Sequence, residues 1–549
     1  MNKQIYRCLP VILALLMLGA CKDLDELNIN PNGVDPSNAH PNLLMSTVIT
    51  QTAQNVVGLG YGDLAGVMQH TQKDGWSGSH NSYEWNGRSW SGFYGIARNT
   101  RELYAKAEAA GLEFHQGVAL VIEAYTFGMI ADLWGDAPYS TALKGELGGE
   151  ANLQPAFDSQ ADIYTGILAD LERANTLLSK NQTDYADINA TQDVLFSGDV
   201  SRWRKFANAL ALRYYMRISE KDPATAKAGI EKIANDPATY PLPLDASDDA
   251  LVDYPGTSST DSWPQNTVFD GTGGSNFRRL KMCATLVESL QALNDPRLGV
   301  WAAKIAIPIV VDESLPDDTD VIENGVRKVA KNVADDYEAL FGYPIDSDPE
   351  YVGLPPAWST VPQAYNLNPN LEQAPNNPHV SHLNDMYREP SGPLLKARLM
   401  SAAEVNFILA EAAFKGWSVG AGAQAFYEAG VKASLDAWAV GNQYNDYIAG
   451  PAAYNGTLEQ IIEQKWIASW TAAAEAWADY RRTGLPALQA GPATVRPVLP
   501  VRFAYSQDEL NFNSKNATAA ISKLEATPYG EGNSEWAKMW LLQGTGKPW

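Results

Sequence analysis

The sequence predicts a mainly α-helical protein in which helices pack in pairs and long irregular stretches contain small β elements. Several segments place apolar residues at helical spacing, which is typical of helices that bury one face. Hydrophobic residues make up 45% of the 549 residues, enough for a large core. The stretches between these segments are rich in Gly, Ser, Asn and Pro, which favour turns and loops.

Residues 1–20 have the pattern of a secretion signal. Lys3 and Arg7 precede an apolar run from Leu9 to Met17, which is shorter than the roughly 20 residues that span a bilayer. The run ends in Leu18-Gly19-Ala20-Cys21, which resembles the lipobox of bacterial lipoproteins, where the cysteine is acylated and becomes the mature N-terminus. The alternative is an ordinary cleaved signal with a cysteine there by chance.

Residues 21–40 are predicted to form a lipidated N-terminus and tether. Lys22, Asp23, Asp25 and Glu26 are similar to the signal that exports lipoproteins of Bacteroidetes to the outer face of the outer membrane. The alternative is a solvated segment such as follows any anchor. Acyl chains at Cys21 would hold the protein at the extracellular face of the outer membrane without a membrane-spanning helix.

Helices dominate the first half of the predicted single domain, 41–549. In the segment 114–133, Val118, Ile122, Tyr125 and Met129 form one apolar stripe. Residues 70–90 are too rich in Gly, Ser and Asn to continue a helix. The predicted helices within the helical part 42–236 are 42–57, 91–110, 114–133, 158–180 and 200–219.

Residues 237–399 are predicted to be an irregular insert on the ligand side. Pro, Asp, Ser, Thr and Gly dominate it, apart from a helix at about 279–294 and a short strand within Ile305–Val311.

Helices return in 400–484, as 400–417, 421–440 and 457–483. The first two resemble an αα-hairpin of about 40 residues, near the tetratricopeptide period of about 34. Arg481 and Arg482 suit the negative end of the last helix, Gly484 suits its C-cap, and Pro486 prevents continuation. The tail 485–549 is rich in loops and shows no separate domain.

Charge and cysteine content exclude several classes of protein. The formal net charge of −23 argues against binding to nucleic acid or to anionic lipid. Of the 3 cysteines, Cys8 leaves with the signal and Cys21 carries lipid, so Cys283 has no disulfide partner. A buried, small hydrophobic role for Cys283 is favoured over a nucleophilic one.

Aromatic residues suggest a ligand class. The chain has 16 Trp and 25 Tyr, many of them in loops between polar residues. An exposed ring stacks on the apolar face of a sugar, and polar neighbours bond its hydroxyls. Loop aromatics also pin irregular segments to the core, and for any single Trp that role is the favoured one.

Many segments in the same order resemble the SusD/RagB family of nutrient-binding outer-membrane lipoproteins. Two of them, Glu404–Trp417 and Glu463–Pro486, carry the most specific match. The others are Asn28–Asn38, Tyr125–Leu143, Ser201–Ser219, Asn294–Leu298, Tyr351–Pro355 and Val498–Phe503 with Tyr505, Glu509 and Asn511.

The resemblance implies a SusD-like fold, with about four tetratricopeptide-like helix pairs on one face and a loop-rich ligand side opposite. It also implies a lid on a SusC-like TonB-dependent transporter that receives a captured glycan, or in RagB-like members a peptide. The matched residues Trp477, Asp479, Tyr480, Arg481 and Arg482 are expected to serve the core and the helix end, not the ligand.

The ligand site is therefore expected in loops, where aromatic rings would stack and Asp, Asn and Arg would bond hydroxyls. Trp90 and Tyr94 are instead expected in a helix core. The candidates, in three groups, are Asp74, Trp76, Tyr83, Trp85 and Arg88; Trp263, Asn266 and Phe269; and Trp358 and Arg388.

No catalytic motif emerges: HExxH, GxSxG and Walker A patterns are absent. A non-catalytic binder is expected, with a surface glycan hydrolase and a structural scaffold as alternatives. No cofactor is expected. His379 and His382 are a weak metal pair, and a structural calcium near Asp317, Asp318 and Asp320 is less favoured than a solvated acidic loop.

Overall fold

The computed structural model describes residues 39–371 and 377–549. The signal, the lipobox at Cys21 and almost all of the tether lie outside these residues. The described chain is mainly helical with three small sheets, as predicted.

The helices of the first half are confirmed, with ends shifted by a few residues. Ser159 and Asp199 cap their helices by accepting from backbone N–H groups in the first turn. Three helices in this half, α4, α7 and α10, were not predicted. The elements are α3 (Pro41–Gly60), α4 (Asp63–Val67), α5 (Ser91–Ala109), α6 (Glu113–Trp134), α7 (Glu150–Leu153), α8 (Gln160–Leu177), α9 (Val200–Arg217) and α10 (Pro223–Asn235).

Helix α6 is the centre of this half. Every residue from Phe114 to Trp134 is buried, and α5, α8 and α3 pack around it. Among the described helices, α6 alone is long and apolar enough to cross a bilayer, yet it is enclosed by protein. Its apolar character is therefore that of a core helix.

The second group of helices corrects one prediction. The segment 457–483 is two helices, because Thr471 adopts a left-handed conformation (φ 68°) and the chain turns between them. The predicted end is confirmed: Gly484 has φ 77° and its N–H bonds to Tyr480 O. These helices are α15 (Ala402–Phe414), α16 (Ala423–Ala437), α17 (Tyr444–Ala449), α18 (Leu458–Ala468) and α19 (Ala473–Thr483).

The insert contains the described strands except β1, together with four helices. The helix predicted at 279–294 is α12 (Ala284–Ala292). It begins only at Ala284 because residues 280–282 form β3 and pair antiparallel with β1. The strand predicted within Ile305–Val311 is β4. The strands are β1 (Thr71–Lys73), β2 (Ala250–Asp253), β3 (Leu280–Met282), β4 (Ile309–Asp312), β5 (Asp320–Glu323), β6 (Val326–Ala330) and β7 (Lys396–Met400).

The sheets join distant parts of the chain. They pair β1 with β3, β2 with β7, and β4 and β5 with the central β6. Of the helices in the insert, only α12 was predicted; the others are α11 (Ser275–Arg279), α13 (Leu298–Trp301) and α14 (Lys331–Phe341).

Single turns and a short helix pair complete the described chain. The tail holds α20 (Gln507–Phe512) and α21 (Ser514–Ile521). The turns are η2 (Gly78–Ser82, a π-helix) and the 3₁₀ turns η3 (Gly145–Leu147), η4 (Gln182–Asp184), η5 (Ala246–Asp248), η6 (Pro362–Leu367), η7 (Asp385–Arg388), η8 (Gly441–Gln443) and η9 (Trp540–Leu542).

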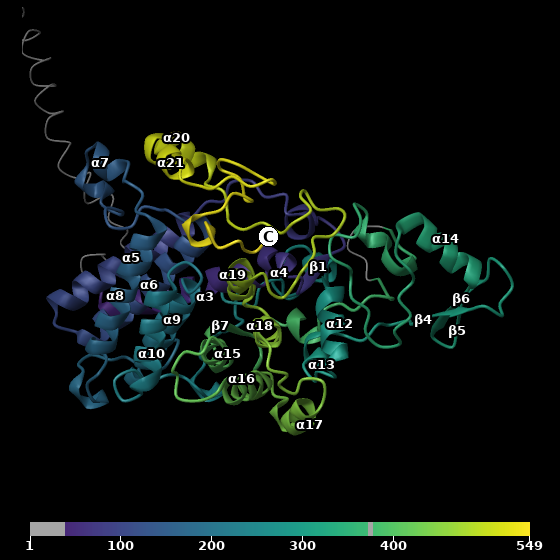
Figure 1. Cartoon of the computed structure of the whole chain (residues 1–549), viewed down its shortest axis with the longest axis horizontal. Helices are drawn as coiled ribbons and strands as arrows, with labels where there is room; N and C mark the ends of the chain where they lie inside the picture. Colours follow the sequence, from purple (N-terminus) through teal and green to yellow (C-terminus); the bar gives the residue numbers. More distant parts are fainter. Residues whose placement is uncertain (1–38, 372–376) are drawn as a thin grey trace, which may run out of the picture.

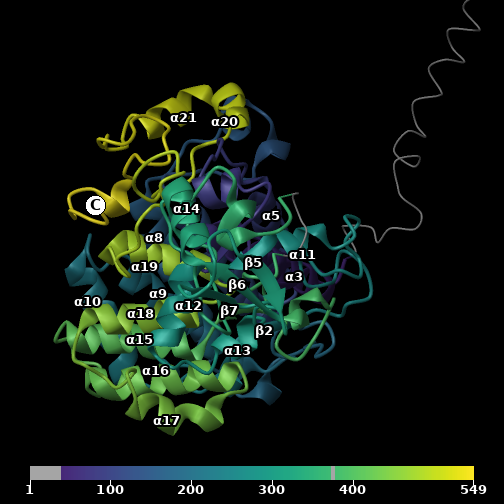
Figure 2. The ribbon, with the colours of Figure 1, turned by 90° about the vertical axis from the view of Figure 1, so that its right-hand side faces the viewer.

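Figure 1 shows how these parts are arranged. The helices α5 to α10 gather at one end, and α15 to α19 lie in the middle and below. At the opposite end, α14 and the sheet of β4, β5 and β6 project from the body. Figure 2 shows α15, α16 and α17 stacked on one side, with α20 and α21 at the far side. The helical pairs and the loop-bearing insert thus occupy different parts of the surface.

Candidate ligand-binding surface

The loop after β1 carries the most exposed aromatic residue among the predicted site residues. Trp76 is 75% exposed and has a left-handed backbone (φ 52°), which non-glycine residues seldom adopt. The guanidinium of Arg279 lies over its ring, with Cζ 4.9 Å from the ring centroid. One face of the indole is therefore supported from behind, and the rest of the ring faces solvent.

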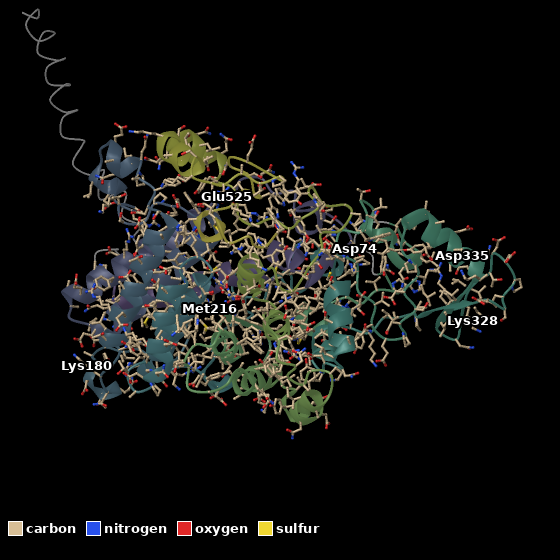
Figure 3. All side chains as sticks on the ribbon, in the orientation of Figure 1. Asp74, Lys180, Met216, Lys328, Asp335 and Glu525 are labelled. Atoms are coloured by element: carbon tan, nitrogen blue, oxygen red, sulfur yellow. The ribbon has the colours of Figure 1, made fainter. Side chains whose placement is uncertain are left out.

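Asp74 supports this loop from inside. It is buried, its carboxylate lies 3.1 Å from the Nζ of Lys281, and its backbone N–H bonds to Arg279 O. Burial raises the pKa of Asp74, and the Lys281 ammonium opposes that effect. Figure 3 labels Asp74 in the body of the protein, between the helical end and the projecting lobe. Asp74 was predicted to contact ligand, but its position makes it a positioning residue under the loop.

Arg88 closes the other end of the same loop. Its Nη2 lies 2.5 Å from Oδ2 of Asp63, and its guanidinium covers the rings of Trp85 and Phe503. Burial opposes the charge on Asp63, but hydrogen bonds from His80 and Arg88 hold the pKa of Asp63 below its usual range. The guanidinium of Arg88 is therefore engaged in holding the loop to α4.

Two aromatic residues of the first group lie in the core. Tyr83 is 1% exposed and Trp85 is 8% exposed. The Nε1 of Trp85 donates to Ser79 O at 2.7 Å, and its ring packs against Trp477 and Phe503. The expectation of exposed stacking rings at these two positions is wrong, because the rings pin the loop to the helical body.

The second predicted group divides in the same way. Trp263 is fully buried among Tyr61, Tyr254 and Tyr387, so it presents no surface to a ligand. Asn266 is also buried, and its Oδ1 accepts from the backbone N–H groups of Val268 and Phe269.

Phe269 follows Asn266 and is 37% exposed, so the turn that Asn266 stabilises presents this ring at the surface. Asn266 thus positions Phe269 and is not itself open to solvent.

The third predicted group, Trp358 and Arg388, also contains one buried and one exposed residue. Trp358 is 3% exposed and packs against Phe341, Tyr343 and Tyr365 in a second, smaller core. Arg388 is half-exposed and lies over the ring of Phe277, in α11. Its backbone carbonyl accepts from Thr267 N–H, so it lies beside the loop of Phe269.

The exposed members of the three groups lie on connected segments. The strand pair β1–β3 joins the Trp76 loop to α11, and Arg388 lies against α11 and the Phe269 loop. We call Trp76, Arg279, Phe269 and Arg388 the Trp76 platform. Sequence reasoning missed Arg279, the half-buried last residue of α11, because only the pairing of β1 with β3 brings it to Trp76.

Other predicted features have ordinary partners. Cys283 is buried, and burial raises its pKa to about 12, as expected for a small core residue. The Nε2 of His379 lies 3.0 Å from Arg327, and Asp320 pairs with the same Arg327. No group of three or more potential metal ligands occurs within residues 39–371 and 377–549.

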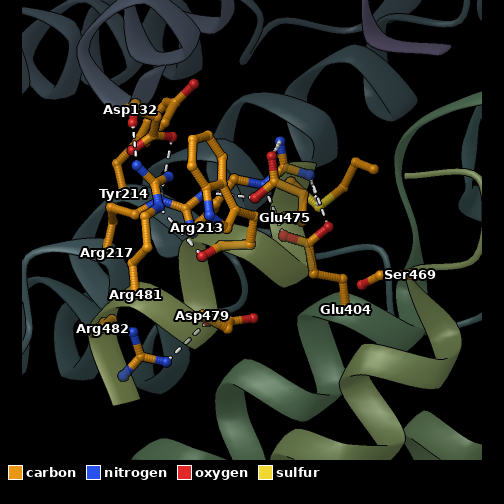
Figure 4. A network of polar contacts seen from close by, with 12 residues as sticks. Asp132, Arg213, Tyr214, Arg217, Glu404, Ser469, Glu475, Asp479, Arg481 and Arg482 are labelled. Carbon is orange, nitrogen blue, oxygen red and sulfur yellow. Dashed lines mark hydrogen bonds and ion pairs between the residues drawn. The ribbon is translucent and has the colours of Figure 1, made fainter. Parts of the chain in front are cut away.

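The residues assigned to the core form a buried ion network between α6, α9, α15, α18 and α19 (Figure 4). The guanidinium of Arg482 bonds Glu411 and Asp479, and that of Arg481 lies 4.1 Å over the ring of Trp477. Asp479 also pairs with Lys465 at 2.8 Å. These positions confirm that the strongest sequence motif serves the core.

Comparison with known proteins shows which family the chain resembles. A family model, SusD-like_2, described as starch-binding and associating with the outer membrane, matches residues 33–310 and 358–506. No curated protein matches the chain.

Three solved structures share the fold. A SusD homologue from Bacteroides fragilis has 22% identity and a TM-score of 0.67, with coverage of 92% of this chain and 99% of its own. A SusD-like protein from Bacteroides thetaiotaomicron has 21% identity and a TM-score of 0.65, with 91% and 98% covered. A chitin-binding SusD homologue from Flavobacterium johnsoniae has 23% identity and a TM-score of 0.64, with 90% and 98% covered.

The family match confirms the resemblance that the sequence motifs predict. It covers both helical groups and the loops of the Trp76 platform. The chain therefore belongs to the SusD-like family of starch-binding proteins that associate with the outer membrane.

Proposed function

We propose that this protein captures a glycan at the cell surface on the Trp76 platform and passes it, uncut, to a SusC-like TonB-dependent transporter. The family's description as starch-binding and associated with the outer membrane supports the class of ligand and the location. Acyl chains on Cys21 would supply the anchor. The transporter is the partner that the family resemblance implies.

The observation that carries the proposal is the exposed, supported indole of Trp76. A ring that is 75% exposed loses contact with the core, and its backbone adopts a conformation unfavourable for tryptophan. A role in recognition accounts for both features. Sugar C–H groups stack on such a ring, while the guanidinium groups of Arg279 and Arg388 donate to hydroxyls nearby.

The solved relatives suggest which glycans to test first. One of them binds chitin, and the family description names starch. Both are polysaccharides with extended apolar ring faces, which suits a platform more than an enclosed pocket.

The proposal predicts that Trp76→Ala weakens glycan binding by about tenfold, since an aromatic stacking contact contributes roughly 1 kcal/mol or more. Calorimetry of the lipid-free protein against starch, chitin, fructan, mannan and host-glycan oligosaccharides, with peptides included, measures the effect. Phe414→Ala is the matched control, because Phe414 is 43% exposed at the end of α15, on the helical side.

Three results would contradict the proposal. Equal affinity of Trp76→Ala and the unmodified protein would remove the platform as the site. Affinity for peptides alone would favour a RagB-like function. Release of shorter oligosaccharides during incubation would favour a glycan hydrolase.

A further inference from the structure

A second, separate pocket lies between α7 and α20. Its volume is about 170 Å³, and its walls come from the start of α5, the loop after α6, α7 and the tail. Figure 1 shows α7 and α20 near each other, at the end of the molecule away from α14. The pocket shares no residue with the Trp76 platform. Its lining is Trp90, Tyr94, Pro138, Ala142, Leu143, Leu153, Pro155, Glu509, Phe512 and Asn513.

Aromatic and aliphatic side chains form most of the pocket lining. Trp90 and Tyr94 pack edge to face, with ring centroids 5.4 Å apart. Phe512 and Leu153 at the rim are 71% and 65% exposed, so large apolar side chains remain in water. Leu143 in the wall has a left-handed backbone (φ 63°), which non-glycine residues seldom adopt.

Glu509 is the charged group of this pocket. One carboxylate oxygen, Oε1, accepts from the Nε1 of Trp90 at 2.9 Å. No Lys or Arg in the described part of the chain forms an ion pair with Glu509, and the charge nearest in sequence is the like charge of Asp508. Burial raises the pKa of Glu509, whereas the bond from Trp90 lowers it. A half-buried carboxylate without a cation therefore lies beside aromatic rings.

The other polar atoms of the pocket have partners. Asn513 donates to Pro155 O at 2.9 Å, and its Oδ1 accepts from Asn516. The hydroxyl of Tyr94 donates to Pro138 O at 2.6 Å. The binding capacity that remains is that of an anion next to ring faces, and both attract a cation.

We propose that this pocket binds the ammonium-bearing ring of an amino sugar, with Glu509 as the ion-pair partner and Tyr94 and Phe512 as the aromatic walls; Trp90, which is 6% exposed, is a core residue that holds Glu509 in place. The rings of Tyr94 and Phe512 can stack on the apolar C–H face of a sugar ring while Glu509 pairs with its ammonium group. The net charge of −23 also favours cationic over anionic ligands. This site goes beyond the proposed function and does not depend on the Trp76 platform.

The test compares ligands that differ in one charge. Calorimetry of the whole lipid-free protein is carried out with a glucosamine trisaccharide and with its N-acetylated counterpart, which lacks the ammonium groups. We expect the glucosamine trisaccharide to bind at this pocket. Glu509→Gln should weaken its affinity by about tenfold. Glutamine keeps an oxygen that accepts from Trp90 Nε1, so this variant removes the charge and keeps the hydrogen bond.

Two further variants separate the charge effect from the pocket walls. Phe512→Ala removes an exposed ring and is expected to weaken binding several-fold without loss of folding, which the thermal midpoint checks. Asp508→Asn is the matched control for charge, because Asp508 is exposed and does not line the pocket. Trp76→Ala is expected to leave this affinity unchanged, which distinguishes the two sites.

Several outcomes would overturn the proposal. These are no binding of the glucosamine trisaccharide, equal binding of the acetylated form, and an affinity unchanged in Glu509→Gln. Competition by a lysine-containing peptide that Glu509→Gln abolishes would assign the pocket to a protein side chain instead. None of these results bears on glycan capture at Trp76.

Discussion

Glu475 holds the centre of the buried ion network. Its carboxylate lies 2.5 Å from Nη2 of Arg217 and 3.4 Å from Nη1 of Arg213. Burial disfavours its charge, but the two guanidinium groups hold the pKa of Glu475 below its usual range. Glu475 from α19 thus links two cations from α9, which pair in addition with Glu404 and Asp132 (Figure 4).

Glu475→Gln should destabilise the protein by about 3 kcal/mol, because it removes part of the negative charge that balances two buried guanidinium groups. Urea denaturation measures the free energy of unfolding. Asp335→Asn is the matched control: it removes one charge from the exposed pair with Lys331, and its effect should stay below about 1 kcal/mol. Similar effects for the two variants would show that the network contributes little.

The same network makes the stability of the protein depend on pH in the acidic range. The pKa values of Glu475 and Asp479 are lowered in the folded state, so their contribution is complete above the unfolded values of about 4. As pH falls below about 4, the unfolded chain takes up protons first, and stability is lost. The fall should be shallower in Glu475→Gln.

At the residue scale, sequence reasoning identified aromatic loops but not which rings face water. Trp76 and Trp85 lie in one polar loop with similar neighbours, yet one is exposed and the other contacts Trp477 and Phe503. The difference depends on partners far along the chain. The same holds for Trp263, which three tyrosines from separate segments enclose.

Among the elements, α4 and η2 position the platform loop by close backbone contact. A Cβ on Gly66 in α4 would lie 2.1 Å from the backbone oxygen of His80 in η2. The same loop is held by Asn81, whose side chain bonds both the N–H and the carbonyl of Lys73. The approach of α4 to η2 thus fixes the segment that carries Trp76.

Gly66→Ala should therefore cost about 1–3 kcal/mol through overpacking, and should also weaken glycan binding at the platform. Gly58→Ala is the control, since it lies exposed in α3 with nothing near its Cβ, where alanine is expected to stabilise slightly. Thermal unfolding and calorimetry of both variants check this. Normal stability and affinity in Gly66→Ala would contradict the role of this contact.

Long periodic elements were predictable, and their interruptions were not. The stripe of Val118, Ile122, Tyr125 and Met129 identified α6 because burial of a long helix leaves a regular pattern. The break between α18 and α19 arises at Thr471, in a stretch free of Gly and Pro. The first turn expected for α12 is a strand because β1 pairs with it, and β1 is distant in sequence.

On the scale of the molecule, the buried ion network and the proposed binding platform occupy different parts. The ion network joins the two helical groups, whereas the Trp76 platform is built from the insert and the loop after β1. The family resemblance predicted this division. The positions of the exposed rings required the fold, because Arg279 reaches Trp76 only through the pairing of β1 with β3.

Under the proposed function, attachment to the outer membrane would hold this platform beside a transporter. We expect Cys21→Ala to move the protein from the membrane fraction to the soluble extracellular or periplasmic fraction, since no acyl chain would then be attached. Cell fractionation and labelling of surface proteins measure this.

Glycan affinity of the purified variant should be unchanged, because Trp76 and Arg279 belong to the folded body and not to the tether. Growth on the bound glycan should nevertheless slow, because tethering keeps the binder at high effective concentration beside its transporter. Membrane association that persists in Cys21→Ala would refute the lipobox.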